Sequence, residues 1–204
     1  MRYRLSALRC LKESHHPLSF KARKLSGIKS IMSNYRRSQT AGASYFFTVV
    51  TLHRKKILTS DNTITILRDA FRKIKTEKPF EIEAIVILPD HLHCIWNMPE
   101  GDADYSNRWR EIKKYVTKRI TTVRSKTKAG NVWQPRFWEH QIRDKRDWRN
   151  HMDYIHFNPV KHGYVDAPVL WQYSSFHKWV KKGVYDANWG SSEIPQHIRQ
   201  MDKE

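Results

Sequence analysis

Residues 80–98 read FEIEAIVILPDHLHCIWNM, two apolar runs separated by Pro89 and Asp90. The first run is rich in β-branched residues and ends continuously apolar, as is typical of a central strand covered on both faces. The second run, 91–98, again favours a strand, and the Pro-Asp pair between them favours a turn. The segment therefore predicts a β-hairpin inside a sheet.

On either side of this hairpin, strand-like and helix-like periodicities alternate. Strands are predicted at 44–52 and 133–142, and Pro135 favours an edge or irregular position for the second. Helices are predicted from a cap at 59–61 to Pro79, over 105–126, and over 147–157, where Asn158 and Pro159 end the last one. The order β-α-β-β-α-β-α predicts an α+β fold with a ferredoxin-like, RRM-like core. In this fold helices cover one face of an antiparallel sheet, and a C-terminal helix follows.

Three regions differ in composition. Residues 1–31 hold eight lysines and arginines against the single Glu13 and show no periodicity. We expect a basic, flexible extension there, or an upstream start with the working protein beginning at Met32. Residues 32–180 are predicted to form one domain and residues 181–204 a polar tail. The chain beyond Pro168 is expected to pack partly and to fray near its end.

The chain of 204 residues carries a formal net charge of +18. So large a positive excess indicates a polyphosphate partner, with an acidic membrane surface as the next candidate. No run of about 18 apolar residues is present, so no membrane-spanning segment is expected. The two cysteines, Cys10 and Cys94, fit neither a disulfide framework nor a cysteine zinc site, and the cytoplasm is the expected location.

His91 and His93 are separated by one residue on the second strand of the hairpin. Side chains at i and i+2 of a strand project from the same face, about 6–7 Å apart at the backbone, so both imidazoles can bind one metal ion. Leu92, Cys94 and Trp96 then point into the core. The alternative is a pair of half-exposed histidines beside a turn, because a single His-x-His pattern is a weak signal.

Tyr154 and Asn158 are four residues apart on the last predicted helix, so a phenol and an amide lie on one flank. The neighbouring face, which should pack on the sheet, carries Trp148, Met152 and Ile155. Alternatively, Tyr154 is structural and Asn158 is a C-cap before the proline. The combination of two histidines, an amide and a tyrosine in a basic chain, with no competing carboxylate pair or serine triad, favours this group as the active site.

Six basic residues are candidates for DNA contact, because arginine beside aromatic residues suits a stacked, partly single-stranded substrate. They are Arg36, Arg37, Arg108, Lys113, Lys114 and Arg136. The alternative is a solvated basic face over core tryptophans. Trp109 is expected in the core because it falls on the apolar stripe of its helix. The strand pattern also turns His140 toward the site, without a defined role.

The stretch ILPDHLHCIW resembles the histidine–hydrophobe–histidine motif of the HUH single-tyrosine transposases. More narrowly, the chain resembles the REP-associated tyrosine transposases, which act on short palindromic repeats. The similar stretches follow family order over residues 32–179: MSNYRRS, FFTVVT, KPFEIEAIVILPDHLHCIWNMPEGD, RWREIKK, WQPRFWEHQIRD and HMDYIHFNPVKHGYV. Residues 121–131 look long for the family.

The resemblance implies a role for each residue of the group. His91 and His93 match the family's metal ligands, Tyr154 matches its nucleophile, and Asn158 its third, amide-type ligand, with Mg²⁺ or Mn²⁺ as the metal. It implies a sequence- and structure-specific endonuclease and strand transferase. Such an enzyme cuts single-stranded DNA near palindromic repeat hairpins through a covalent 5′-phosphotyrosine. The resemblance also favours a monomer over a dimer.

Two other functions fit the same residues. A ferredoxin-like sheet also serves as a non-catalytic DNA or RNA hairpin-binding module, although the strands show no RNP-like aromatic pattern. A rolling-circle initiator would share the histidine motif, but the sequence contains no helicase or P-loop segment.

Overall fold

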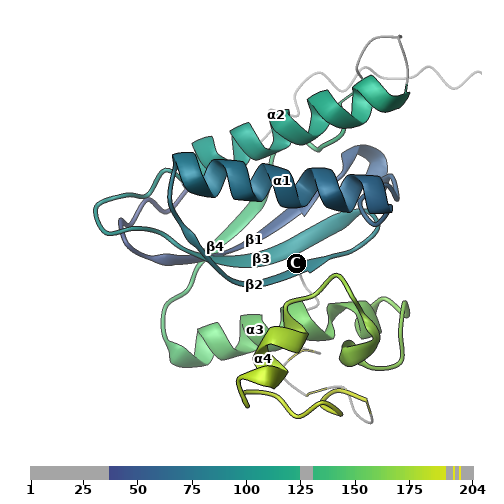
Figure 1. The fold of residues 1–204 in the computed structure, drawn as a ribbon. Helices are drawn as coiled ribbons and strands as arrows, with labels where there is room; N and C mark the ends of the chain where they lie inside the picture. The colour runs from purple at the N-terminus through teal and green to yellow at the C-terminus, as the bar shows by residue number, and fades with distance from the viewer. Residues whose placement is uncertain (1–36, 125–130, 192–194, 196–197, 199–204) are drawn as a thin grey trace, which may run out of the picture. The chain divides into compact units, whose positions relative to one another are not determined.

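The computed structural model describes residues 37–124 and 131–191, together with Pro195 and Ile198. Arg36 and the predicted extension at 1–31 lie outside these residues, as does most of the 121–131 insertion. The elements are β1 (Ser44–Val50), η1 (Leu52–Arg54), α1 (Asp61–Glu77), β2 (Glu81–Ile87), β3 (His91–Asn97), α2 (Tyr105–Arg124), β4 (Trp138–Gln141), α3 (Lys145–Lys161), η2 (Pro168–Leu170) and α4 (Phe176–Lys181) (Figure 1). Among the described residues, no helix has the length and apolar character needed to cross a membrane.

The four strands form one antiparallel sheet in the order β2-β3-β1-β4. β2 and β3 are the predicted hairpin, closed by a hydrogen bond from the Leu88 N–H to the His91 C=O (2.8 Å). With α1 and α2 as the crossover helices, this order is the ferredoxin-like α+β core, and the predicted fold class is confirmed.

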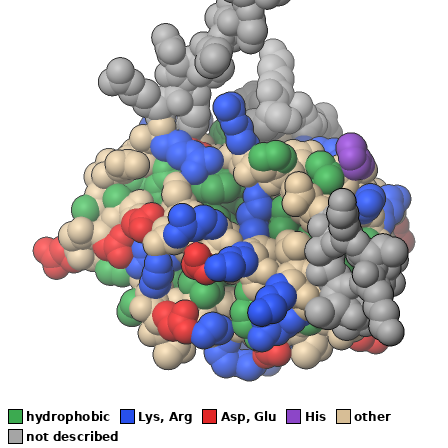
Figure 2. All heavy atoms as spheres, turned by 90° about the horizontal axis from the view of Figure 1, so that it is seen from above, with side chains coloured by type: hydrophobic (Ala, Val, Ile, Leu, Met, Phe, Trp, Pro, Cys, Tyr) green, Lys and Arg blue, Asp and Glu red, His purple; other side chains and the backbone are tan. Residues whose placement is uncertain are grey.

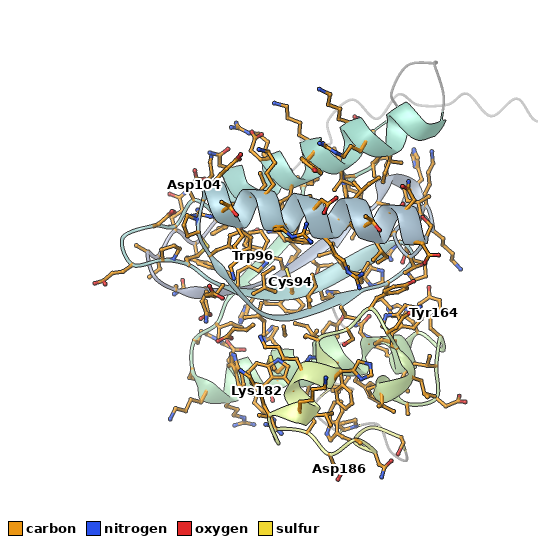
Figure 3. All side chains as sticks on the ribbon, viewed as in Figure 1. Cys94, Trp96, Asp104, Tyr164, Lys182 and Asp186 are labelled. Carbon is orange, nitrogen blue, oxygen red and sulfur yellow. The ribbon has the colours of Figure 1, made fainter. Side chains whose placement is uncertain are left out.

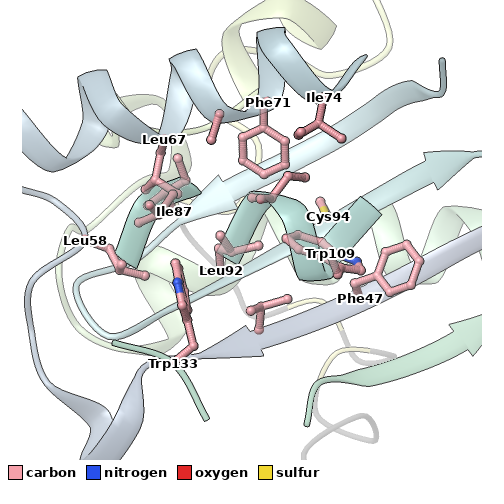
Figure 4. Packing of buried hydrophobic residues seen from close by; sticks show 14 of the residues in the cluster. Phe47, Leu58, Leu67, Phe71, Ile74, Ile87, Leu92, Cys94, Trp109 and Trp133 are labelled. Carbon is pink, nitrogen blue, oxygen red and sulfur yellow. The ribbon is translucent and has the colours of Figure 1, made fainter. Parts of the chain in front are cut away.

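α1 and α2 cover one face of the sheet (Figure 1). Cys94 and Trp96 of β3 point into this layer (Figure 3), where the Trp96 indole stacks on Trp109 of α2 with 4.3 Å between ring centroids. Leu67 and Phe71 of α1 close the same core (Figure 4). The expected burial of Trp109 is confirmed, because its position on the apolar stripe of α2 faces the sheet.

α3 and α4 lie on the opposite face of the sheet (Figure 1). Phe46, Val86 and Ile95 project to this side from three strands and pack against Met152 and Ile155 of α3. The predicted packing of the last helix on the sheet through Met152 and Ile155 is therefore confirmed, and the structure adds that it occupies the face that α1 and α2 leave open. An apolar second face must be buried by another layer, and the last helix provides it.

β4 is shorter than predicted. Of the expected strand 133–142, only Trp138–Gln141 pairs with β1 in a ladder, and Trp133 makes an isolated bridge to Thr51. Pro135 lies between the two, and its lack of an N–H interrupts the pairing.

α3 is longer than predicted at both ends. It begins after Asp144, whose carboxylate accepts the Asp147 N–H, and it runs through Pro159 to Lys161. Proline removes one helical hydrogen bond, but the buried Phe157 anchors the last turn to the second core. Asn158 and Pro159 therefore do not end the helix, and Asn158 is not its C-cap.

The segment beyond α4 contributes to the second core. Tyr185 and Ile198 are buried there, and Trp189 packs against it. Apolar side chains within residues 181–204 therefore pack against α3 and α4, so the second core extends beyond residue 180.

Candidate active site

β3 presents His91 and His93 on the face that α3 covers, with ring centroids 4.9 Å apart. Each Nδ1 has a fixed partner: His91 Nδ1 lies 2.6 Å from Asp90 Oδ1, and His93 Nδ1 lies 2.9 Å from Thr48 Oγ1. With Nδ1 engaged, Nε2 is the nitrogen that each ring offers to a ligand. Both histidines therefore face the same side of the sheet, as predicted.

Burial lowers the pKa of both histidines, and that of His93 falls well below its usual value. For His91 the neighbouring Asp90 carboxylate opposes this effect without reversing it. Burial would raise the pKa of Asp90, but hydrogen bonds from His91 and from Arg54 (3.1 Å) hold it below its usual value. A neutral imidazole therefore donates to an ionised carboxylate, which is the state in which histidine binds a metal.

Tyr154 and Asn158 project from α3 toward the same two histidines. The Tyr154 ring lies 5.2 Å from the His93 ring. Asn158 is fully buried and lies close enough to His91 to raise the pKa of that ring. Among the described residues, however, neither Oδ1 nor Nδ2 of Asn158 has a hydrogen-bond partner in good geometry.

This unsatisfied amide has a chemical explanation. A buried polar group without a partner costs about 1–3 kcal/mol, so its persistence suggests a ligand that it is placed to meet. The Asn158 oxygen and the two Nε2 atoms form a donor set that suits a divalent ion. Three protein ligands also leave coordination positions for phosphate oxygens.

Two residues of the site were not predicted from the sequence. Lys161 Nζ lies 3.5 Å from the Tyr154 hydroxyl and 4.7 Å from the centre of its ring. The His162 ring lies 5.1 Å from the His91 ring. Both were missed because the helix was expected to end at residue 157. The spacing of seven residues between Tyr154 and Lys161 would have placed them on one face of a longer helix.

His140 makes contacts next to this site rather than in it. His140, Asp147 and His151 bring potential metal-ligand atoms within 4.8 Å of one another. However, Asp147 Oδ2 already accepts hydrogen bonds from His140 Nε2 (2.8 Å), from the Arg143 N–H (3.0 Å) and from Arg143 Nε (2.9 Å). The guanidinium charge opposes a second cation, so we regard this trio as a capping and packing network.

Arg108 is not placed to contact DNA. Its side chain is 2% exposed, and its donors are taken up by the Asp102 carboxylate and by the backbone carbonyls of Lys78, Pro79 and Asp104. The predicted DNA contact is therefore wrong for this residue. The sequence pattern marks a basic helix, but it does not reveal that this arginine ties the start of α2 to the loop after α1.

Arg37, Lys113 and Lys114 line a groove of about 860 Å³ together with Trp133 and Phe137. The Arg37 guanidinium lies 4.1 Å from the centre of the Phe137 ring. Burial, with Arg37 as a smaller cause, lowers the pKa of Lys113 to about 8. The groove runs along α2, on the side of the sheet away from Tyr154. Figure 2 looks onto the side that carries α1 and α2 and shows lysines and arginines spread across it.

Arg136 is exposed, close to the groove in sequence. The structure thus brings together the predicted group His91, His93, Tyr154 and Asn158. The basic groove lies on the other side of the sheet from this group.

The chain is similar to known proteins over most of its length. Residues 39–158 match the family model described as "Transposase IS200 like". The chain is 48% identical over 158 residues to the REP-associated tyrosine transposase of Escherichia coli (strain K12), covering 78% of this chain and 91% of that protein. A Haemophilus influenzae relative is 44% identical over 168 residues, covering 79% of this chain and 95% of its own length.

A solved structure described as a REP-associated tyrosine transposase bound to a REP hairpin has 47% sequence identity and a TM-score of 0.70. The similarity covers 80% of this chain and 95% of that one. The family match includes the sheet, both crossover helices and α3 as far as Asn158, so the histidine pair and the tyrosine lie inside it. The chain therefore belongs to the IS200-like transposase family, and within it to the REP-associated tyrosine transposases.

Proposed function

We propose that the protein is a DNA strand transferase that cuts single-stranded DNA next to palindromic hairpins, with Tyr154 as the nucleophile. The observation that carries the proposal is the buried Asn158 amide beside His91, which has no hydrogen-bond partner in good geometry among the described residues, with the Tyr154 ring against His93. A relative whose structure is described as bound to a REP hairpin supports a hairpin as the substrate. The net charge of +18 supports a phosphate-rich partner.

His91, His93 and Asn158 would hold Mg²⁺ or Mn²⁺. When bound, such an ion polarises a phosphate oxygen and stabilises the charge that develops during displacement. Asp90 and Thr48 hold the two imidazoles with Nε2 directed away from their hydrogen bonds, so the ligand geometry does not depend on the substrate.

Tyr154 then performs the covalent step. Its hydroxyl oxygen forms a bond to the phosphorus while the bond from phosphorus to the 3′ oxygen breaks. The phenol loses its proton, and the departing 3′ oxygen takes one up. The products are a 5′-phosphotyrosine and a free 3′ hydroxyl. A 3′ hydroxyl can later attack the phosphotyrosine, restore a phosphodiester and release the phenol, so no ATP is needed.

Lys161 supports this step electrostatically. Its ammonium lies 3.5 Å from the Tyr154 hydroxyl. Negative charge develops there on the phenol oxygen and on the attacked phosphate during the reaction. The DNA backbone would be bound by the groove residues Arg37, Lys113 and Lys114, together with Arg36 and Arg136. We propose that the protein works as a monomer in the cytoplasm.

The test is covalent capture. The wild-type protein is incubated with Mn²⁺ and an end-labelled hairpin oligonucleotide with single-stranded tails, and the mixture is run on a denaturing protein gel. We expect a labelled protein band that disappears in Tyr154→Phe and on chelation. No adduct in the wild type, or an undiminished one in Tyr154→Phe, would contradict the proposal. Hairpin binding without cleavage under any metal would instead favour a non-catalytic binding module.

A further inference from the structure

A row of side chains crosses the sheet beside the candidate active site. Thr48 of β1 is the register partner of His93 on β3 and of Trp138 on β4. Directly opposed residues in antiparallel strands share a face, so His93, Thr48 and Trp138 all project toward the side that carries Tyr154. Trp138 is two interstrand spacings, or about 10 Å at the backbone, from the histidine.

Trp138 is unusually exposed for a tryptophan on this face. It is 38% exposed, and among the described residues Leu170 is the other large hydrophobic side chain that is exposed. Phe46 connects it to the site, because the Phe46 ring lies 5.6 Å from Trp138, 5.4 Å from His93 and 5.9 Å from Tyr154. The exposed indole is therefore continuous with the ring cluster around the nucleophile.

The ring of His140 supports the indole from one side. The indole is nearly parallel to that ring, at 4° with 5.9 Å between centroids, and His140 stacks in turn on His151 at 4.6 Å. His140 is fixed by Asp147, which Arg143 also holds. A flat ring oriented in advance loses little freedom when a second flat ring stacks on it.

We propose that Trp138 is a stacking platform for an unpaired DNA base that neighbours the scissile phosphate. The proposal rests on the proposed function for its substrate, and it adds a base-binding position outside the metal ligands and the nucleophile. Stacking on an aromatic ring is the usual way to hold an unpaired base. Arg136 and Arg143 are exposed at the two ends of β4, where they can meet the adjoining phosphates.

The experiment measures DNA binding without cleavage. Full-length wild-type, Trp138→Ala and Trp138→Phe proteins are titrated, in the presence of a chelator, with a hairpin oligonucleotide carrying 5′ and 3′ single-stranded tails. A series of the same oligonucleotide has one abasic site moved through each tail position. Leu170→Ala is the matched control, because it also removes an exposed apolar side chain.

We expect Trp138→Ala to weaken binding to the intact oligonucleotide roughly tenfold, with Trp138→Phe recovering most of the loss. One abasic position should weaken wild-type binding by a similar factor and add no further loss in Trp138→Ala. Leu170→Ala should bind as the wild type does. Circular dichroism and thermal unfolding of each variant separate loss of contact from loss of fold.

Penalties that add independently at every tail position would overturn the platform, as would unchanged binding by Trp138→Ala. The coupled position must also border the phosphate that becomes attached to Tyr154, and a coupled base far from that phosphate would overturn it as well. The covalent capture assay judges the proposed function separately. If the wild type forms an adduct but no abasic position is coupled to Trp138→Ala, only the stacking proposal is wrong. If one position is coupled but no adduct forms, the proposed cleavage activity is wrong and Trp138 remains a base-binding residue.

Discussion

The carboxylate of Asp90 and the ring of His91 are joined by a hydrogen bond of 2.6 Å between Oδ1 and Nδ1. The contact comes from adjacent residues at the turn of the β2–β3 hairpin, and it leaves Nε2 of His91 directed toward the site. A carboxylate in this position orients a metal-binding imidazole and increases its basicity.

Replacement of Asp90 by Asn should therefore weaken metal binding. We expect the affinity for Mn²⁺, measured by isothermal titration calorimetry, to fall about 10- to 100-fold, because the amide cannot match the carboxylate as an acceptor. Asp69→Asn, a half-buried acid on α1, is the control and should leave the affinity unchanged. Equal affinity in Asp90→Asn and in the wild type would argue against a metal ion at His91.

Asn158→Ala should abolish adduct formation at little cost to folding. The substitution removes a buried amide that makes no hydrogen bond in good geometry among the described residues, and this relief offsets the cavity that the smaller side chain leaves. We expect the free energy of unfolding in urea to fall by less than about 1 kcal/mol, whereas Met152→Ala in the second core should cost about 2–5 kcal/mol. A loss as large as that of Met152→Ala would indicate a structural role for the amide.

Lys161→Met should slow adduct formation without a comparable loss of hairpin binding. The ammonium lies beside the Tyr154 hydroxyl, where charge develops, so its effect falls on the transition state. We expect an adduct rate about 10- to 100-fold lower, partly restored in Lys161→Arg. Lys178→Met on α4 is the control. A change confined to the dissociation constant would show that Lys161 only binds DNA.

The stability of the protein should fall in mild acid, and His156 should contribute part of that fall. Burial, with Arg149 as a smaller cause, lowers the pKa of this ring from 6.5 to about 3 in the folded state. Above pH 6.5, His156 is neutral in both the folded and the unfolded state, so it does not reduce the free energy of unfolding. Below pH 6.5, His156 binds a proton in the unfolded chain but stays neutral in the folded protein. The free energy of unfolding therefore falls as the pH falls toward about 3.

The loss should approach about 1.4 kcal/mol per pH unit below pH 6.5. Urea unfolding at about pH 7 and about pH 5 measures it. His156→Gln should reduce the slope by this amount and leave the contributions of His91 and His93, whereas the exposed His177→Gln should not change it. An unchanged slope in His156→Gln would assign the acid sensitivity to other groups.

Arg108 and Lys114 lie on the same helix but should give opposite results. Arg108→Ala breaks a buried, hydrogen-bonded contact with Asp102 and should lower the free energy of unfolding by about 2 kcal/mol or more. Lys114→Ala should leave stability unchanged while weakening hairpin binding and reducing its salt dependence by about one ion. Binding unaffected by Lys114→Ala would exclude this lysine from the DNA contact.

The local periodicity of the sequence determined which side chains share a face of each strand and helix. Alternation along the third strand separates His91 and His93 from Cys94 and Trp96, because successive side chains of a strand face opposite sides whatever surrounds them. A spacing of four residues likewise places Tyr154 and Asn158 on one flank of a helix. The order of strands and helices was sufficient for the ferredoxin-like core, and the resemblance to a known family assigned the roles.

Only the tertiary structure decided where these faces meet. It places α3 on the second face of the sheet, carries that helix past Pro159 to Lys161, and buries Arg108 under a loop. It also aligns Trp138 with His93 through Thr48. These features depend on cross-strand register and on packing between distant segments. Such interactions can outweigh the local tendency of a proline to end a helix or of an arginine to face water.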